Sequence, residues 1–299
     1  MIKKRTIFPV FLLLASLFSV RAFQWPVDQV VLKQTFGEAD EGAFNTGLTL
    51  GGGRQEVRPI SDGEVLYYYR DEQGPGAIPS GLGNFVVMEH ERSLFSVYSH
   101  LEPDSPVLEG ALSMTGVTGD TVIGYVGLSG DAPGRELNLE IVDLEFNQMV
   151  NPLKLLPPLK DTTRPVVEGV FFRQRGEWEA LSDGMSLASG EKELFISAYD
   201  QSESVAYMRP MAPFRISVFA NGEEIFYQTF EAVESRDKEL YLVSRQDLRS
   251  FRELYADDRH IRIGILKLNP GETILEIIVT DYRGNRSLRN LKFRVLPES

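Results

Sequence analysis

The sequence lacks cysteine entirely and contains only 3 histidines among its 299 residues. Without cysteine the chain can form no disulfide framework and no thiolate zinc site, and it has no thiol nucleophile. The shortage of histidine limits any imidazole-based chemistry to His90, His100 and His260. Candidate catalytic or metal-binding residues are therefore few enough to be weighed one by one.

The chain also has no long hydrophobic run beyond its N-terminus. There, Lys3, Lys4 and Arg5 precede an apolar stretch over residues 7–20 that ends in Val20-Arg21-Ala22. A basic start, a short apolar stretch and a small-x-small ending are typical of a secretory signal peptide. The alternative, a membrane anchor, needs about 20 apolar residues, and this stretch is shorter. We expect a signal peptide over residues 1–22, cleaved after Ala22.

Basic residues are scarce, since 31 Lys and Arg face 43 Asp and Glu. Signal cleavage would remove four of the basic residues and leave 27 against 43 acidic ones, a net charge of −16. A strongly acidic surface repels nucleic-acid phosphates and offers no polybasic patch for anionic lipid. We expect no nucleic-acid partner, no membrane span after cleavage, and a secreted protein located in the periplasm or outside the cell.

Helical periodicity is scarce after the signal, and short alternating apolar runs are common. Alternation with a period of two is typical of half-buried β-strands, and Gly, Pro, Asp and Ser clusters separate the runs. The sequence predicts an all-β protein. Its first half contains runs over residues 63–69, 84–90, 94–100 and 121–127; its second half contains runs over residues 193–200, 214–230, 260–266, 273–285 and 291–296.

A proline-rich stretch over residues 151–165 interrupts this pattern, because proline cannot continue a central strand. We place a domain boundary there, with a first domain over residues 23–157, a linker over 158–165 and a second domain over 166–299. Asn221-Gly222 predicts a tight hairpin in the second domain, since both central residues of such a turn need positive φ. The strand spacing there favours an immunoglobulin-like β-sandwich. Residues 244–257 have apolar side chains at helical spacing and predict a short helix on it.

Three stretches of the first domain resemble a known family. They are "GNFVVMEHERSLFSVYSHLEP" (83–103), "TGDTVIGYVGLSGDAPGRELNLEI" (118–141) and "VNPLKLL" (150–156). In order and spacing, residues 35–157 are similar to the lysostaphin-type (LytM-like) zinc metallopeptidases, which cut peptide cross-links in bacterial peptidoglycan. The resemblance implies an antiparallel β domain of the duplicated-hybrid-motif type.

The family builds its site from H-x-x-x-D, Y-x-H-L and H-x-H motifs, in which the first His, the Asp and the last His hold zinc. In this sequence the first His corresponds to Asn45 and the Asp to Thr49. The H-x-H motif corresponds to Glu136 and Asn138, with Asn138 at the zinc-ligand position. Asn and Thr offer only neutral oxygen donors, which are poor zinc ligands. We therefore expect no zinc and no other cofactor.

The resemblance leaves one catalytic position intact, because "VYSHL" keeps His100 where the family has a catalytic histidine. Strand alternation places it on the same face as Tyr98. His100 is either a residual general base or a vestigial polar residue lining a cleft. His90 corresponds to a turn histidine of the family and is expected to be structural.

Three hypotheses follow from these residues. The first is an inactive LytM-like pseudoenzyme that binds peptidoglycan peptide or regulates a cell-wall hydrolase. The second is an active metalloendopeptidase that cleaves peptidoglycan cross-links with non-standard ligands. The third is a structural envelope protein whose groove has no ligand. The absent zinc ligands favour the first.

Overall fold

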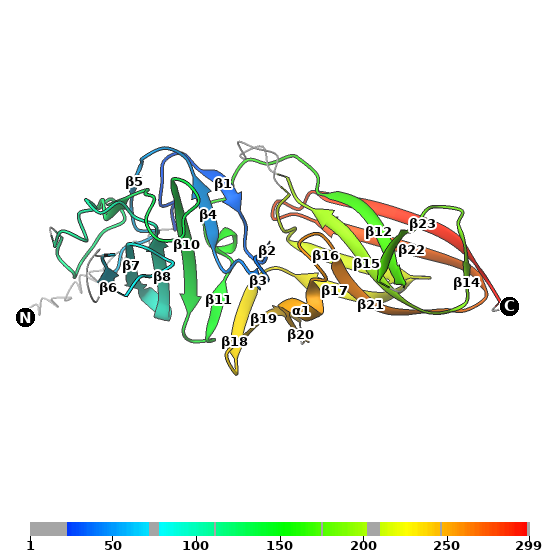
Figure 1. The fold of residues 1–299 in the computed structure, drawn as a ribbon. Helices are drawn as coiled ribbons and strands as arrows, with labels where there is room; N and C mark the ends of the chain where they lie inside the picture. The colour runs from blue at the N-terminus through cyan, green and yellow to red at the C-terminus, as the bar shows by residue number, and fades with distance from the viewer. Residues whose placement is uncertain are drawn as a thin grey trace, which may run out of the picture.

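A computed structural model describes residues 23–71, 78–110, 112–174, 176–201, 210–245 and 247–297 (Figure 1). Nearly all regular structure among them is β-strand in antiparallel sheets, which confirms the predicted all-β class. The molecule is elongated, with two strand-rich halves joined end to end. The expected signal peptide over residues 1–22 lies outside the described residues. No helix in the described part of the chain is long and apolar enough to cross a membrane.

The first half is built on a large sheet. Its central strand, β10 (Glu136–Asp143), pairs with β8 on one side and with β4 and then β11 on the other. The remaining strands extend the sheet in the order β8, β7, β6, and β1 pairs with β4. These strands are β1 (Val31–Gln34), β4 (Leu48–Gly51), β6 (Glu64–Tyr69), β7 (Phe85–His90), β8 (Leu94–Ser99) and β11 (Gln148–Val150).

Short elements complete this half. The strand pairs β2 (Ala39–Asp40) with β3 (Ala43–Phe44), and β5 (Glu56–Val57) with β9 (Gly124–Tyr125), form small ladders beside the main sheet. Two 3₁₀ turns, η1 (Glu91–Ser93) and η2 (Pro152–Lys154), follow β7 and β11. The Asn151 side chain accepts a hydrogen bond from Leu153 N and so caps η2.

The second half is a β-sandwich of a four-stranded and a five-stranded sheet. Asn221 and Gly222 both have positive φ in the β16–β17 turn, so the predicted hairpin is confirmed. The assignment of this sandwich to the immunoglobulin class stays a prediction. The strands are β12 (Val166–Gln174), β13 (Glu177–Ala180), β15 (Gly190–Tyr199) and β21 (Ile261–Leu268), packed on β14 (Ser186–Ala188), β16 (Arg215–Ala220), β17 (Glu223–Thr229), β22 (Gly271–Thr280) and β23 (Arg286–Leu296).

Three strands from the second half of the sequence join the sheet of the first half. These are β18 (Ala232–Arg236), β19 (Glu239–Ser244) and β20 (Asp247–Ser250), and β18 pairs with β11. The predicted helix over residues 244–257 is reduced to a single turn, α1 (Phe251–Leu254). The residues before α1 form β20, which pairs with β19. The boundary expected near residues 158–165 is therefore crossed by a continuous sheet.

The hydrophobic core of the sandwich also includes side chains from the first half. Phe36 and Phe44, from the first half, belong to the core of the sandwich. The Phe44 ring contacts Phe251 at 5.5 Å between centroids, and the Tyr255 hydroxyl donates to the Gly37 carbonyl at 2.9 Å. These contacts bind the segment just before Asn45 to α1. The loop of the candidate site is thus anchored on the second half.

Candidate functional site

A pocket of about 830 Å³ lies in the first half, beside β1, β4 and β10. The tip of the β2–β3 hairpin, the segment after β8 and the loop before β10 complete its wall. The structure brings together at this pocket all the residues that the family resemblance singled out: Asn45, Thr49, His100, Glu136 and Asn138. They converge from three separate stretches of sequence.

Asn45 and Thr49 both direct their side-chain hydrogen bonds into the protein. Asn45 Nδ2 donates to the carbonyls of Thr35 and Gly47 at 3.0 and 3.2 Å. Thr49 is only 6% exposed, and its hydroxyl donates to Gln34 Oε1 at 3.1 Å. Gln34 lies directly opposite Thr49 on β1, so the pairing of the two strands fixes this bond. Both side chains act as structural links around the pocket.

Asn138 lies on β10 directly opposite Thr49 on β4. Its Oδ1 is buried and has no hydrogen-bond partner among the described residues. This atom lies against Gly47, where an added Cβ would come within 2.9 Å of it. Glu140, two residues after Asn138 on β10, accepts a hydrogen bond from the Thr46 hydroxyl at 2.5 Å. The loop over residues 44–47 is therefore packed closely onto β10.

Glu136 forms an ion pair that sequence reasoning missed. Its Oε2 accepts from Lys33 Nζ at 2.7 Å, and the glutamate side chain is 7% exposed against 37% for the lysine. Side chains alternate along β10, since Leu137 and Leu139 are fully buried and the pocket-lining Asn138 lies between them. Lys33 reaches Glu136 across Gly51, which pairs with Glu136 on β4. No local motif signals this contact, because 103 residues separate the partners.

His100, which the resemblance aligns with the family's catalytic histidine, faces the pocket. Its ring Nδ1 lies 2.9 Å from the Ser129 carbonyl. A carbonyl can only accept, so Nδ1 carries a proton, and in the neutral ring Nε2 then holds the lone pair. Nε2 has no hydrogen-bond partner among the described residues. The ring is thus held in the tautomer that a general base requires.

The prediction that His100 shares a strand face with Tyr98 is wrong. β8 ends at Ser99, and His100 has a φ of 64°, so the alternation of the strand stops before it. Tyr98 is fully buried and its hydroxyl accepts from Ile60 N at 2.8 Å. The left-handed backbone at His100 is what turns this ring away from the core and into the pocket.

His90 lies away from the pocket, in the core side of the sheet. It is 6% exposed, its Nε2 lies 2.7 Å from the Ser96 hydroxyl, and its Nδ1 lies 3.0 Å from the Asp62 carbonyl. Burial lowers the pKa of His90 below its usual value. These contacts agree with a structural histidine. They also separate His90 from His100, so the two cannot share a metal ion at the pocket.

The pocket residues do not fit the zinc ion of the family. Asn45 and Thr49 supply neutral oxygen ligands, and hydrogen bonds within the protein already orient both side chains. The carboxylate of Glu136 is held by an ammonium group, which repels a cation placed beside it. Zinc sites use imidazole, thiolate or carboxylate ligands. Of the five positions that correspond to the family's motifs, only His100 and Glu136 have such a group, and the Glu136 carboxylate is paired with Lys33. The motif positions therefore do not provide the set of three ligands that the family uses for zinc.

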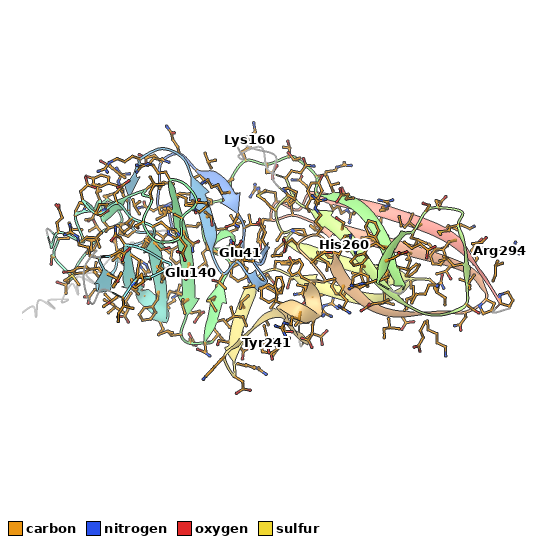
Figure 2. The ribbon with its side chains drawn as sticks, in the orientation of Figure 1. Glu41, Glu140, Lys160, Tyr241, His260 and Arg294 are labelled. Atoms are coloured by element: carbon orange, nitrogen blue, oxygen red, sulfur yellow. The ribbon has the colours of Figure 1, made fainter. Side chains whose placement is uncertain are left out.

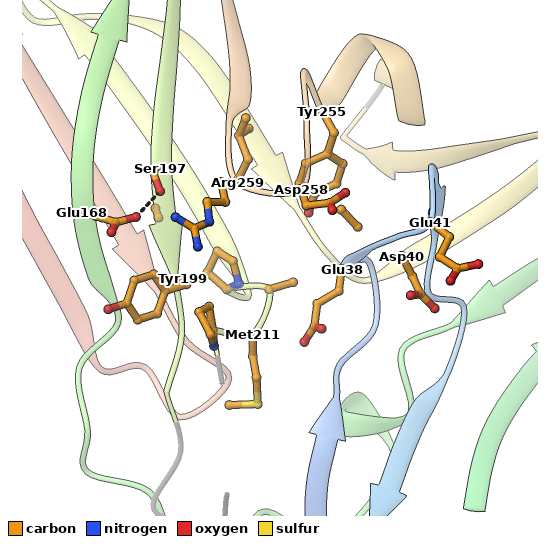
Figure 3. Close-up of a pocket in the computed structure, with 16 residues that line it drawn as sticks. Glu38, Asp40, Glu41, Glu168, Ser197, Tyr199, Met211, Tyr255, Asp258 and Arg259 are labelled. Carbon is orange, nitrogen blue, oxygen red and sulfur yellow. Dashed lines mark hydrogen bonds between the residues drawn. The ribbon is translucent and has the colours of Figure 1, made fainter. Parts of the chain in front are cut away.

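A second pocket, of about 570 Å³, lies between the two halves (Figure 3). Figure 3 shows Glu38, Asp40 and Glu41 on one side of it and Arg259 on the other. Asp40 and Glu41 line both pockets, so the β2–β3 hairpin separates two adjoining hollows. In Figure 2, Glu41 lies near the middle of the molecule. The combined surface is rich in carboxylates and favours ligands that carry amino groups.

Comparison with known sequences gives two matches. A protein-family profile matches residues 164–296. A protein of Treponema pallidum (strain Nichols), described as uncharacterized, is 30% identical over 138 residues, which are 43% of this chain and 93% of that protein. The chain belongs to the same family as this Treponema pallidum protein. The description of that relative names no activity, so family membership supplies none.

Solved structures resemble this chain only distantly. A zinc-containing peptidase from Vibrio cholerae is 22% identical with a TM-score of 0.33, over 40% of this chain and 36% of the peptidase chain. The catalytic domain of the M23 protein EnpA from Enterococcus faecalis is 21% identical with a TM-score of 0.34, over 44% of this chain and 94% of that domain. Scores this low carry no argument about activity, so the function is argued from the residues of the pocket.

Proposed function

We propose that this chain is a catalytically inactive LytM-like peptidase homologue of the bacterial cell envelope, whose pocket holds a peptide without cutting it. One observation carries the proposal: Asn45, Thr49 and Asn138, which the resemblance aligns with the family's metal ligands, line one pocket, and Lys33 pairs with Glu136 beside them. Such a set does not hold the ion that activates water in these peptidases. What the pocket keeps is its volume and polar lining.

The partner in this proposal is a peptidoglycan peptide or a peptide segment of a cell-wall hydrolase that the chain regulates. Three features support a peptide ligand. The pocket has about 830 Å³, which is within the range of small-ligand sites. Asp40, Glu41 and Asp131 line it and favour amino groups. The adjoining hollow between the halves extends the surface, so that an elongated ligand can run past the β2–β3 hairpin.

The catalytic part of the proposal is tested by metal analysis and peptidoglycan digestion. Purified mature protein, dialysed against buffer with zinc, is expected to retain far less than one zinc per chain and to release no muropeptides from sacculi. The free Nε2 of His100 favours the competing reading, an active metalloendopeptidase with non-standard ligands. Stoichiometric zinc together with cleavage that His100→Ala abolishes would establish that reading and overturn the proposal.

The binding part is tested by retention on purified sacculi and on immobilised envelope extract. Asp40→Lys reverses a charge at the junction of the two pockets, and we expect it to reduce retention at least tenfold. Glu145→Lys is the matched control, because Glu145 is exposed on the β10–β11 turn and lines neither pocket. Equal retention of both variants would refute binding at the pocket. No retention of the unmodified protein on either matrix would leave the structural envelope protein.

A further inference from the structure

Three aspartates meet at the middle of the molecule, outside both pockets described above. Asp161 lies in the segment between the halves, Asp200 follows β15 and Asp281 follows β22. One carboxylate oxygen of each lies within 4.8 Å of those of the other two. The three residues come from stretches far apart in the sequence, so the fold assembles this group.

Two of the three carboxylates are almost completely buried. Asp281 is 1% exposed, and it accepts from the backbone N–H groups of Arg283 and Asn285 and from Asn285 Nδ2. Asp200 is 6% exposed, and its Oδ1 accepts from Gln201 N. Its Oδ2 has no hydrogen-bond or ion-pair partner in the described part of the chain. The Asp200 side chain lines a small cavity of about 60 Å³ that Asp161 also lines.

The described part of the chain provides no ion-pair partner for this group. Among the described residues, no Lys, Arg or His nitrogen forms an ion pair with any of the three carboxylates. Buried carboxylates are normally paired with a cation or bound to a metal, because an isolated buried charge is costly. The three aspartates therefore have the charge and the oxygen atoms that a cation site requires.

We propose that Asp161, Asp200 and Asp281 bind a Ca²⁺ ion at the junction of the two halves. The donors are all oxygen, which calcium prefers and zinc does not. Two oxygens bound to one Ca²⁺ at about 2.4 Å lie at most about 4.8 Å apart, and the separations between the three carboxylates meet this requirement. The adjacent cavity has room for water molecules that complete the coordination.

The ion would connect the segment between the halves to the sandwich. Asp161 is already tied to the strand ends by its carbonyl, which accepts from Asn285 Nδ2 at 3.2 Å. Asp281 is held by the turn that Arg283 and Asn285 form. A shared ion adds a bond between these two parts of the chain and to the end of β15. Calcium is then a structural ligand that stabilises the junction, independent of what the pocket binds.

The test uses the full mature chain with CaCl₂ or MgCl₂ in titration calorimetry and thermal unfolding. We expect one Ca²⁺ per chain and a Tm rise of about 5 °C at a concentration 100 times Kd. Asp200→Asn keeps the shape of the side chain and removes a buried charge. We expect this variant to lose the calcium-dependent shift and to match or exceed the Tm of the calcium-free parent protein.

Asp237→Asn is the matched control, since Asp237 is exposed in the β18–β19 turn, and it should keep the full calcium effect. The absence of heat and of a Tm shift with Ca²⁺ would overturn the proposal. An equal calcium effect in the parent protein and Asp200→Asn, or tighter binding of Mg²⁺ than of Ca²⁺, would overturn it as well. The Tm of each variant without calcium reports whether it is folded.

Discussion

At the scale of single residues, the pocket differs from a metal site through the partners of its side chains. Asn45 and Thr49 are engaged by the protein itself, and Lys33 provides the charge next to Glu136. A Lys ammonium that is hydrogen-bonded to a carboxylate neutralises it much as a metal ion would. The site is therefore stable without zinc. Tight zinc binding would require the family's ligand residues and also removal of the Lys33 ammonium group.

This reasoning predicts the outcome of a reversion experiment. Asn45→His, Thr49→Asp, Glu136→His and Asn138→His together restore the family's residues. We expect this quadruple variant to bind zinc more weakly, by at least tenfold, than the same variant with Lys33→Met, because the ammonium repels a dication. Competition with a fluorescent chelator measures both affinities. Equal affinities would show that Lys33 does not oppose the metal, and no zinc in either folded variant would contradict the residue correspondence.

His90 predicts a pH dependence of stability. Burial lowers the pKa of His90 in the folded state, whereas an unfolded histidine titrates near 6.5. The unfolded chain then binds more protons at this site below pH 6.5, so the stabilisation is complete above pH 6.5 and is lost as the pH falls towards the folded pKa. Urea unfolding at pH 8, 6 and 5 should show a steeper loss for the parent protein than for His90→Gln. Parallel pH profiles would contradict the assignment.

At the scale of elements, the β2–β3 hairpin joins the pocket to the second half. Phe44 ends this hairpin directly before Asn45, and its ring packs on Phe251 and Tyr255. Gly37, at the base of the hairpin, has a φ of 83° and lies against Phe230, so a side chain there would be strained and would collide with that ring. The position of the pocket loop is therefore set by α1 and its neighbours.

Phe44→Ala tests this connection. Phe44 is 5% exposed, and replacing a buried Phe by Ala costs about 3–5 kcal/mol of unfolding free energy. Phe146→Ala serves as the control, because Phe146 is 64% exposed and its loss should cost less than about 0.5 kcal/mol. Denaturant unfolding measures both. Similar small costs for the two variants would show that Phe44 does not anchor the loop.

At the scale of the whole molecule, the two halves share a sheet and a core. β18, β19 and β20 extend the first sheet through β11, and Phe36 and Phe44 contribute to the core of the sandwich. Because this sheet contains strands from both sides of the proline-rich segment, the stability of each half depends on the other. The unit of folding is then larger than either of the domains expected from the sequence.

A truncation tests this dependence. A chain of residues 23–165 leaves the edge of β11 unpaired and exposes Phe36 and Phe44, so we expect it to aggregate or to lose most of its stability. The intact mature chain should unfold in a single calorimetric transition. A soluble truncated chain with a Tm equal to that of the first of two transitions in the intact protein would instead support independent domains.

The sequence alone determined the features that depend on nearest neighbours. Alternation predicted the all-β class, and Asn221-Gly222 predicted its hairpin because turn geometry is local. The prediction of a helix over residues 244–257 failed in part, since its apolar spacing also suits β20 followed by one helical turn. The resemblance of three stretches to a known family selected five residues that line one pocket.

The tertiary structure decided everything that depends on residues far apart in the chain. Lys33 reaches Glu136, β18 pairs with β11, and the aspartates at 161, 200 and 281 meet, although no short motif connects any of these partners. His100 faces the pocket because its backbone departs from the strand, which alternation cannot foresee. Local patterns encode the strands, whereas packing between distant strands sets which charges meet and which remain without a partner.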